Sequence, residues 1–415
     1  MNIWIFQTGE PIHSDGRNVR PMRAMNLANK LLEAGHSVTI WSSAFFHQTK
    51  THRSKIFKEI KISKKLTIKL IPSTGYKKHI SISRFFDHCI LAYNFHKILR
   101  KQTKIPDVSF VGYPPIEAAY VISLWLKKKN VPFLIDVKDQ WPKIIVERFP
   151  RPLRYFIRFI LTPYYFMAKR AMQFSSGISA HVPAYIDWSL KFSKKLPSKN
   201  DKSFPLTVPQ DKIDSRIISS AIRWWSKAGI KKSNTLRIIY IGSFASVFNF
   251  EPIFEASKYL SKKNFDYEFI ICGSGDRKAE LSLKAKLDKN IKIIDWIDRP
   301  KIVALASISD LALAPYYNTE DFVVSIPNKV IDSLMLGLPV LSSLKGEVES
   351  LIRNNNIGYS YTDGSSLSKC IEQFAADKSD NNKLSTNAKA LYKSKFDFNS
   401  VYNELVLHLE KLKTF

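Results

Sequence analysis

The sequence predicts an α/β fold made of two doubly wound parallel sheets in tandem. Short apolar runs of strand length alternate with segments of helical periodicity over residues 2–138, and again over 237–376. Between the two series, residues 191–234 include a stretch rich in Lys, Ser and Pro that breaks the alternation. A chain of 415 residues is also too long for one ordinary hydrophobic core, so two domains are expected.

The first series opens with the apolar run NIWIF and continues through a polar loop into a helical pattern that ends at Gly35. Because strand–helix–strand repetition is typical of parallel sheets covered by helices on both faces, this half is expected to form one such sheet. The expected strands are 2–6, 36–43, 67–73, 107–113 and 132–138, and the expected helices are 20–35, 83–101 and 115–128.

The second series repeats the pattern after a helix expected at 216–229. Gly337 separates a helix over 326–336 from a short apolar strand over 338–341. The other expected strands are 237–243, 267–275, 291–297 and 310–315, and the other helices are 250–261, 276–287, 300–307, 364–376 and 383–413. We expect domains over 1–205 and 236–395, a linker region over 206–235, and a C-terminal helix over 396–415 that could pack back on the first domain.

The charge balance limits the partners rather than the fold. With 64 Lys and Arg against 36 Asp and Glu, the net charge is +28, which suits an anionic membrane, nucleic acid or a phosphorylated substrate. The three cysteines, Cys89, Cys272 and Cys370, are widely spaced and imply neither a disulfide framework nor a metal cluster, so a reducing compartment is expected. No apolar run of 18 residues and no signal-peptide pattern is found, so neither a spanning helix nor secretion is expected.

Two segments combine basic and aromatic residues. RPLRYFIRFILTPYYFMAKRAMQF (151–174) has this character, and ISISRFFDHCILAYNFHKILRK (80–101) resembles it. Amphipathic segments of this kind suit an anionic membrane surface. Pro163 should break or kink the first segment. The alternative for both is a pair of buried helices with a basic outer edge.

Glycine-containing turns follow several strands. Gly242-Ser243 and Gly273-Ser274-Gly275 each end a strand of the second half, where glycine lets a phosphate or ribose approach the backbone. Neither shows the third glycine of a dinucleotide fingerprint, and ordinary tight turns are the alternative. After the first strand, a loop from Gly9 to Gly16 is followed by Arg17, Arg20 and Arg23, which add positive charge there or form a solvated helix face.

Two further stretches carry candidate site residues. In IPNKVIDSLMLGLPVLSS (326–343), the helix begins near Pro327, Asn328 and Lys329, and this combination suits an anion because backbone N–H groups point outward at a helix N-terminus. In DVKDQWP (136–142), a carboxylate at the strand end could position a hydroxyl or transfer a proton, or it could simply cap the next segment.

Read in order, the motifs of residues 237–361 resemble the nucleotide-sugar-binding half of retaining glycosyltransferases of family 4, which have the two-domain GT-B fold. The N-terminal stretches FQTGEP, PDVSFVGYPP and DVKDQWP look like the acceptor-binding domains of bacterial surface-polysaccharide members (O-antigen, capsule or exopolysaccharide). The resemblance covers almost the whole chain apart from 191–234, and the order of motifs makes it specific.

The resemblance implies sugar transfer from a nucleoside diphosphate to an acceptor hydroxyl with retention, and without a bound metal or other cofactor. Lys329 and the backbone of 327–329 would hold the diphosphate, and Gly242 and Ser243 would let it lie close to the chain. Asp332 takes the position that usually binds ribose, whereas Val324 stands where the family usually has its first acidic residue. Asp139 would contact the reacting sugar or the acceptor, Arg17 would contact phosphates, and the candidate donor site also includes Gly9, Gly273 and Gly275.

The resemblance also implies partners and a location. Acceptors in this group are commonly lipid-linked saccharide diphosphates, so a peripheral enzyme on the inner face of the cytoplasmic membrane is expected. The alternatives are a sugar-nucleotide epimerase or phosphorylase-type relative, a basic nucleic-acid-binding protein, and a non-catalytic scaffold. No nucleic-acid-binding module is recognisable, and Val324 alone supports the scaffold.

Overall fold

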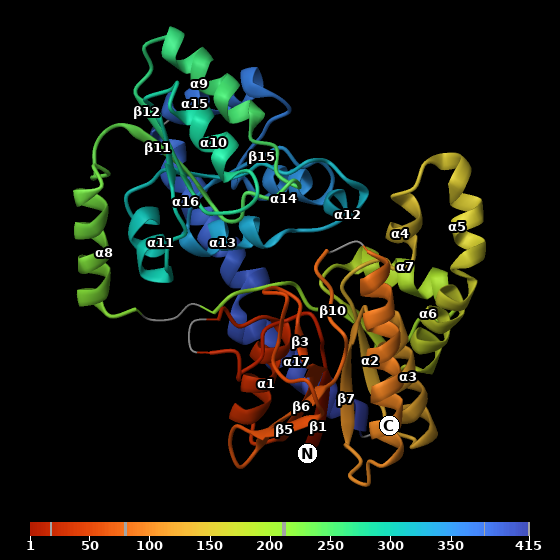
Figure 1. Ribbon diagram of the computed structural model, residues 1–415. Helices are drawn as coiled ribbons and strands as arrows, with labels where there is room; N and C mark the ends of the chain where they lie inside the picture. The colour runs from red at the N-terminus through yellow and green to blue at the C-terminus, as the bar shows by residue number, and fades with distance from the viewer. Residues whose placement is uncertain (17–18, 79–80, 210–212, 377, 414–415) are drawn as a thin grey trace. The chain divides into compact units, whose positions relative to one another are not determined.

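The computed structural model describes residues 1–16, 19–78, 81–209, 213–376 and 378–413 (Figure 1). The chain forms two compact units. The first contains Met1–Pro205 together with Asn399–Phe415, and the second contains Leu206–Phe398. Each unit is an α/β structure with its own sheet, as the alternation of apolar runs predicts.

The first unit is built on an eight-stranded sheet in the order β10-β9-β8-β7-β1-β2-β6-β5, parallel except for the antiparallel pair β5–β6. The five expected strands are confirmed, and β5, β9 and β10 are added at the two edges. The strands are β1 (Asn2–Phe6), β2 (Ser37–Ser43), β5 (Lys58–Lys61), β6 (Leu66–Ile71), β7 (Val108–Tyr113), β8 (Phe133–Val137), β9 (Gly177–Ala180) and β10 (Lys202–Ser203), with a separate hairpin of β3 (Phe45–Phe46) and β4 (Thr51–His52).

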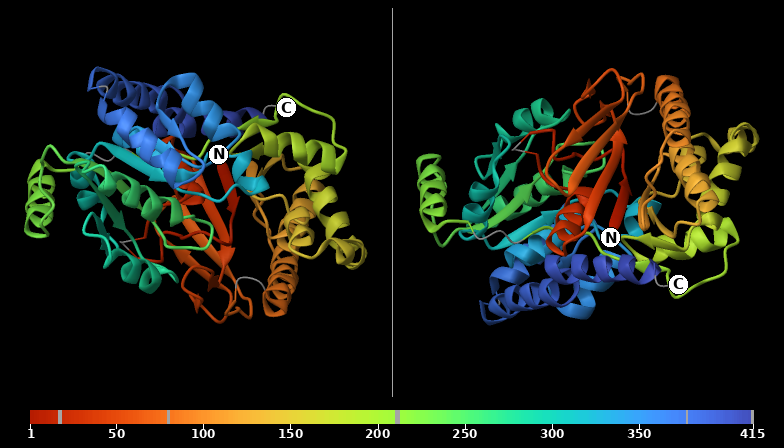
Figure 2. Two further views of the ribbon diagram at one scale, coloured as in Figure 1. Left: turned by 90° about the horizontal axis from the view of Figure 1, so that it is seen from above. Right: turned by 90° about the horizontal axis from the view of Figure 1, so that it is seen from below.

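Aromatic side chains fill the core of the first unit. Trp4 and Trp41 pack edge to face with ring centroids 5.1 Å apart, and Phe6 stacks on Phe95 at 5.2 Å. Helices α2, α3 and α6 contact one another in series, and Figures 1 and 2 show them beside α5 at one side of this sheet. The helices are α1 (Arg23–Glu33), α2 (Ile82–Arg100), α3 (Ile116–Lys128), α4 (Lys143–Glu147), α5 (Arg154–Ile160), α6 (Thr162–Phe174) and α7 (Pro183–Ser193).

Pro163 breaks the basic aromatic segment 151–174, as predicted. Helix α5 ends at Ile160, and α6 begins at Thr162 with the proline in its first turn. Proline is tolerated there because the first N–H groups of a helix have no intrahelical acceptor. Within the described residues, no helix has the length and apolar character that crossing a membrane would require.

The second unit contains a parallel six-stranded sheet in the order β13-β12-β11-β14-β15-β16. The expected strands are confirmed, and β16 is added at one edge. The strands are β11 (Leu236–Ile241), β12 (Tyr267–Cys272), β13 (Ile291–Ile294), β14 (Leu311–Ala314), β15 (Val340–Ser342) and β16 (Gly358–Ser360). The helices are α8 (Ser215–Lys227), α9 (Glu251–Lys262), α10 (Lys278–Ala285), α11 (Arg299–Ala306), α12 (Glu320–Val323), α13 (Asn328–Leu336), α14 (Glu347–Asn355), α15 (Gly364–Ala376) and α16 (Lys378–Leu391).

Residues 206–235, expected as a linker region, contribute helix α8 to the second unit. Trp225 anchors this helix, since its side chain is fully buried and its Nε1 donates to the carbonyl oxygen of Lys301 in α11 at 2.9 Å.

The single helix expected at 383–413 is wrong, because the chain leaves the helical path in the middle of this range. Helix α16 passes into a π-helical turn at Tyr392–Phe396, and Asp397 is extended with ψ 122°. The Tyr392 and Phe396 side chains are buried in the second unit, where Tyr392 Oη donates to the carbonyl oxygen of Val208 at 2.8 Å. Helix α17 (Phe398–Lys413) then begins and packs within the first unit, where Glu410 lies 2.7 Å from His36.

Candidate functional site

In both units, the residues of interest lie beyond the carboxyl ends of the strands, where doubly wound sheets bind ligands. In the second unit, β11 lies between β12 and β14, so the strand order reverses beside β11. The loops that leave β11 and β12 carry the predicted glycines, and helix α13 follows β14 along the chain. The predicted donor-site residues of this half therefore gather at the topological switch point of the sheet.

The two glycine turns pack against each other. Gly242 N–H donates to the carbonyl oxygen of Cys272 at 2.9 Å, and Phe244 N–H donates to that of Ser274 at 2.8 Å. A Cβ on Gly273 would lie 1.8 Å from the Gly242 carbonyl oxygen, and one on Gly275 would lie 2.9 Å from the Phe244 nitrogen. Glycine is required at these positions because the two backbone segments approach each other closely. The sequence alone did not show this reason.

Lys329 reaches this pair of turns from the first part of α13. Its Nζ donates to the carbonyl oxygen of Ile241 at 2.6 Å and lies 4.3 Å from the ring centroid of Tyr240 and 4.9 Å from that of Phe248. A Cβ on Gly242 would lie only 1.6 Å from the same nitrogen. The absence of a side chain at Gly242 therefore makes room for the lysine, and the aromatic faces stabilise its positive charge.

The N-terminus of α13 contributes backbone donors and the predicted ribose-binding acid. Pro327 is the N-cap residue and makes no side-chain capping hydrogen bond, and Asn328 is exposed. Asp332 follows one turn after Asn328 and is half-buried. Burial raises the pKa of the Tyr316 hydroxyl, and the negative charge of Asp332 raises it further. Lys329, the N-terminus of α13 and Asp332 thus lie at one edge of the sheet. A positive charge, free backbone donors and a carboxylate are together suited to a nucleoside diphosphate.

Val324, which replaces the usual first acid, directly follows α12 and is half-buried. Glu320 and Asp321 occupy the first turn of this short helix, and Glu320 is exposed.

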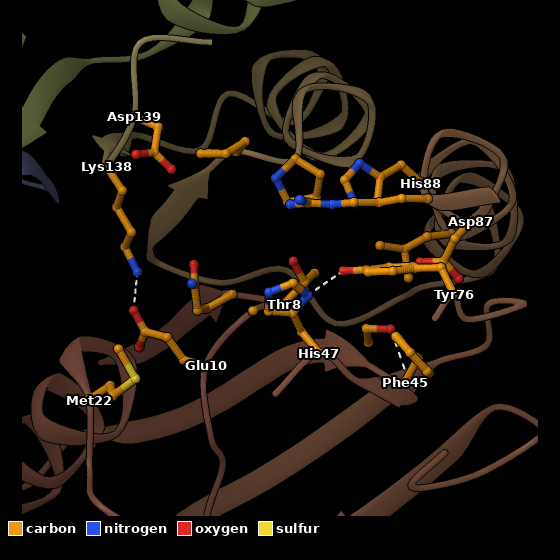
Figure 3. Close-up of a pocket in the computed structure, with 17 residues that line it drawn as sticks. Thr8, Glu10, Met22, Phe45, His47, Tyr76, Asp87, His88, Lys138 and Asp139 are labelled. Atoms are coloured by element: carbon orange, nitrogen blue, oxygen red, sulfur yellow. Dashed lines mark hydrogen bonds and ion pairs between the residues drawn. The ribbon is translucent and has the colours of Figure 1, made fainter. Parts of the chain in front are cut away.

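The first unit has a cavity of about 230 Å³ at the carboxyl edge of its sheet (Figure 3). Figure 3 shows Lys138 and Asp139 on one side of it and Tyr76, Asp87 and His88 on the other. Gly9 and Asp139 are the two predicted site residues that line it. The cavity also includes side chains from the loops after β1, β2, β6 and β7 and from α2.

Glu10 fixes the loop that carries Gly9. Its carboxylate accepts from the backbone N–H of Ala24 in the first turn of α1 at 2.8 Å, and its other oxygen forms an ion pair with Lys138. A carboxylate at a helix N-terminus is favourable because it accepts from a donor that has no intrahelical partner. The loop after β1 is thereby joined both to α1 and to the loop after β8.

The two carboxylates of DVKDQWP have different environments. Asp136 is fully buried and accepts two hydrogen bonds of 2.9 Å from the guanidinium group of Arg23, whereas Asp139 is half-buried and lines the cavity. The positive charge of Arg23 is the main factor that lowers the pKa of Asp136 against the opposing effect of burial. The solvated helix face considered for the arginines is therefore wrong for Arg23. Arg17 lies outside the described residues.

A cluster behind the cavity was not singled out from the sequence. The Glu117 side chain is buried at the start of α3, accepts a short hydrogen bond from Tyr164 Oη, and lies 3.7 Å from His88 Nδ1. Burial raises the pKa of Glu117 to about 7 and lowers that of His88 to about 3, the latter with help from the positive charge of Arg84. The sequence signal was a carboxylate in the first turn of an otherwise apolar helix, IEAAYVISLW.

Part of the chain is similar to a known protein family. Residues 223–391, which lie within the second unit, match the family described as "Glycosyl transferases group 1". A curated relative is the amylovoran biosynthesis glycosyltransferase AmsK of Erwinia amylovora, which is 24% identical over 183 residues. That match covers 43% of this chain and 45% of the relative, so it spans less than half of either protein.

Solved structures match over the full chain. Sucrose-phosphate synthase from Thermosynechococcus elongatus has a TM-score of 0.70 at 13% identity, and covers 100% of this chain and 99% of its own. WaaG, a glycosyltransferase involved in lipopolysaccharide biosynthesis, has a TM-score of 0.65 at 14% identity with 99% of both chains covered. HepE from Anabaena, solved with UDP-glucose, has a TM-score of 0.62 at 14% identity with both chains fully covered. The chain has the GT-B fold of these glycosyltransferases.

Proposed function

We propose that this chain transfers a sugar from a nucleoside-diphosphate sugar to a saccharide acceptor, with retention of anomeric configuration. The observation that carries the proposal is the position of Lys329, whose ammonium group lies at the Gly242 turn and at the N-terminus of α13, at the switch point of a group 1 glycosyltransferase domain. A departing diphosphate needs positive charge and hydrogen-bond donors that are already in place, and this edge of the sheet supplies both.

Each donor-site residue has a separate task in this proposal. Lys329 and the backbone of Pro327 to Lys329 bind the diphosphate, so no metal ion is needed to stabilise the leaving group. Asp332 accepts hydrogen bonds from the ribose hydroxyls. The turns at Gly242, Ser243, Gly273 and Gly275 shape the floor against which the diphosphate lies. UDP is the first nucleotide to test, because HepE was solved with UDP-glucose.

The acceptor binds in the cavity of the first unit. Asp139, which lines this cavity, contacts the acceptor or the reacting sugar. The relatives AmsK and WaaG are named for amylovoran and lipopolysaccharide biosynthesis, which supports a role in bacterial surface-polysaccharide biosynthesis with a lipid-linked acceptor.

Helix α5 gives this enzyme a surface for an anionic membrane. Tyr155, Phe156 and Phe159 are 80%, 63% and 78% exposed, an unusual density of exposed aromatic rings for seven residues of helix. Arg151 and Arg158 flank them, and the whole chain carries a net charge of +28. Aromatic rings inserted at the headgroup level, with arginines beside them, would hold the protein on the inner face of the cytoplasmic membrane.

Product analysis tests the transfer directly. The protein is incubated with UDP-, GDP- and ADP-sugars, with and without a bacterial lipid extract, and nucleotide release and the new glycosidic bond are followed by mass spectrometry and NMR. Acceptor-dependent nucleotide release and a product with the anomeric configuration of the donor are expected. An altered sugar nucleotide without an acceptor would instead identify an epimerase, and inversion would contradict the retaining mechanism.

A further inference from the structure

The cavity of the first unit is lined by His88 and Arg84, which have no role in the proposed function so far. We propose that His88 and Arg84 together bind two hydroxyl groups of an uncharged acceptor sugar, and that the buried carboxylate of Glu117 holds the His88 ring for this purpose. The inference rests on the proposed function, because it concerns the acceptor of the same reaction. The acceptor sugar is uncharged in this proposal, and Glu117 is a positioning residue because it acts through His88.

The partners of His88 indicate which of its ring nitrogens carries the proton. Arg84 Nε donates toward His88 Nε2 at 3.5 Å, so Nε2 carries the lone pair of the neutral ring. The proton is therefore on Nδ1, which faces Glu117 Oε2 at 3.7 Å. This oxygen is buried and has no hydrogen-bond partner among the described residues, whereas Glu117 Oε1 accepts from Tyr164 Oη. The carboxylate thus favours the tautomer that presents an acceptor to the cavity.

The contact between Arg84 and His88 is long enough to be replaced. A separation of 3.5 Å is at the limit of a hydrogen bond, and a ligand hydroxyl could donate to Nε2 at a shorter distance. The Arg84 guanidinium lies against the rings of Tyr76 and Trp141, at 5.5 and 5.1 Å from their centroids, and lines the cavity with a group that has five N–H donors. An acceptor nitrogen beside a donor matches neighbouring hydroxyl groups on one sugar ring.

The charge of the cavity favours a neutral ligand over a phosphate. Its lining includes three carboxylates, Glu10, Asp87 and Asp139, against two permanent cations, Arg84 and Lys138. Glu10 pairs with Lys138, and Asp87 accepts from the backbone N–H of Gly75 at 2.5 Å. Diphosphate sites have an excess of positive charge, whereas this lining mixes donors, acceptors and apolar surface as a polyol requires. A volume of about 230 Å³ suits one sugar ring better than an oligosaccharide.

The protonation of Glu117 provides a readout that a purely structural role would not give. Burial is the main cause of its raised pKa of about 7, and the negative charge of Asp87 also raises the pKa. The hydrogen bond from Tyr164 and the positive charge of Arg84 lower it. The charged or titratable groups that face His88 are Glu117 from α3, Arg84 from α2 and His47 from the loop after β3. When Glu117 is protonated, its uncharged carboxyl group is a weaker acceptor for Nδ1–H, and the ring is held less firmly with its Nε2 lone pair in place. Sugar binding should therefore be stronger at pH 8 than at pH 6.

The test uses the full chain with its nine histidines labelled with ¹⁵N. His88→Asn assigns the His88 signals, and His96→Asn, an exposed histidine of the same helix, is the matched control. Glucose, galactose, mannose, rhamnose and N-acetylglucosamine are titrated separately, with glucuronate and inorganic pyrophosphate as charged probes. We expect a lone-pair signal for His88 Nε2 at pH 8 that shifts with at least one neutral sugar. In Glu117→Gln, the affinity for that sugar should fall about fivefold and lose its pH dependence.

Two results would overturn the inference. One is a His88 signal that responds to no neutral sugar, and the other is a response to glucuronate or pyrophosphate alone. Nucleotide binding by the second unit is followed in the same samples by the thermal shift with UDP. Retained nucleotide binding with a silent His88 would refute the hydroxyl-binding role alone, whereas loss of both would refute the proposed function itself.

Discussion

Lys329 Nζ lies 2.6 Å from the carbonyl oxygen of Ile241, in the space that a side chain on Gly242 would occupy. The missing side chain of Gly242 therefore makes room for the lysine that is proposed to neutralise the leaving diphosphate. The same contact joins helix α13 to the end of β11, so the geometry of the site and the packing of the sheet depend on each other.

Gly242→Ala tests this dependence. The new Cβ would lie 1.6 Å from Lys329 Nζ, and the φ of +153° at this position is strained for any L-residue with a side chain. We expect a loss of stability of about 1 kcal/mol or more and at least a tenfold weaker binding of nucleotide, measured by thermal unfolding and calorimetry. Gly229→Ala is the control, because this glycine of the second unit also has a positive φ, +74°, but a Cβ there meets nothing within 4 Å. Unchanged nucleotide binding in Gly242→Ala would contradict the role of Lys329.

Arg23→Ala should destabilise the first unit without a direct effect on the donor site. Arg23 and Asp136 form a buried pair with side chains 4% and 1% exposed, so removing the arginine leaves a buried carboxylate without its charge partner. The expected loss is about 3–5 kcal/mol in chemical denaturation. Lys30→Ala, which breaks the surface pair with Glu33, should cost about 0–1 kcal/mol. Equal effects of the two variants would show that burial of the Arg23 pair has no energetic consequence.

Glu117 should make stability depend on pH with a defined sign. Its ordinary pKa of 4.5 is raised to about 7 in the folded protein. The protonated side chain therefore contributes its full stability below pH 4.5, and this contribution is lost as the pH rises through 7. Glu117→Gln should therefore be more stable than the parent by up to about 3 kcal/mol at pH 8, with the difference vanishing near pH 4.5. Glu33→Gln, at the surface, should show no such trend. A difference that grows toward low pH would contradict the raised pKa.

The exposed rings of α5 should decide membrane binding. Tyr155→Ser combined with Phe159→Ser should weaken binding to phosphatidylglycerol vesicles at least about tenfold in sedimentation assays at low salt. Trp296→Ser is the matched control, because Trp296 is 65% exposed but belongs to the second unit. If the protein stays in solution with these vesicles, or if the control has the same effect, α5 is not a membrane-binding helix.

Elements with clear periodicity and glycine stops could be predicted from the sequence. The run from Gly337 back to Val330 shows why, since apolar spacing gives the helix and the glycine, at φ +72°, ends it. Edge strands such as β5, β10 and β16 could not be predicted, because their residues are half-buried or exposed and form no continuous apolar run. The break at Asp397 was also hidden, since it depends on where Tyr392 and Phe396 are buried.

Some residues of the candidate sites could be predicted from the sequence, and others could not. Lys329 and the glycine turns could be found because they sit at strand or helix ends that the pattern already defined. Arg23 looked like a surface charge, although it is buried against Asp136, 113 residues away in sequence. Glu117, His88 and Tyr164 come from three different helices, and only the packing of those helices brings them together.

The most direct test of the central claim is the thermal stabilisation of the parent and of Lys329→Ala by UDP, GDP, ADP and CMP, with and without EDTA. A nucleotide at 100 times its dissociation constant should stabilise the parent by about 2.7 kcal/mol. The account predicts this shift for one nucleoside diphosphate, its persistence in EDTA, and its loss in Lys329→Ala. No shift with any nucleotide, or a shift that Lys329→Ala keeps in full, would contradict it.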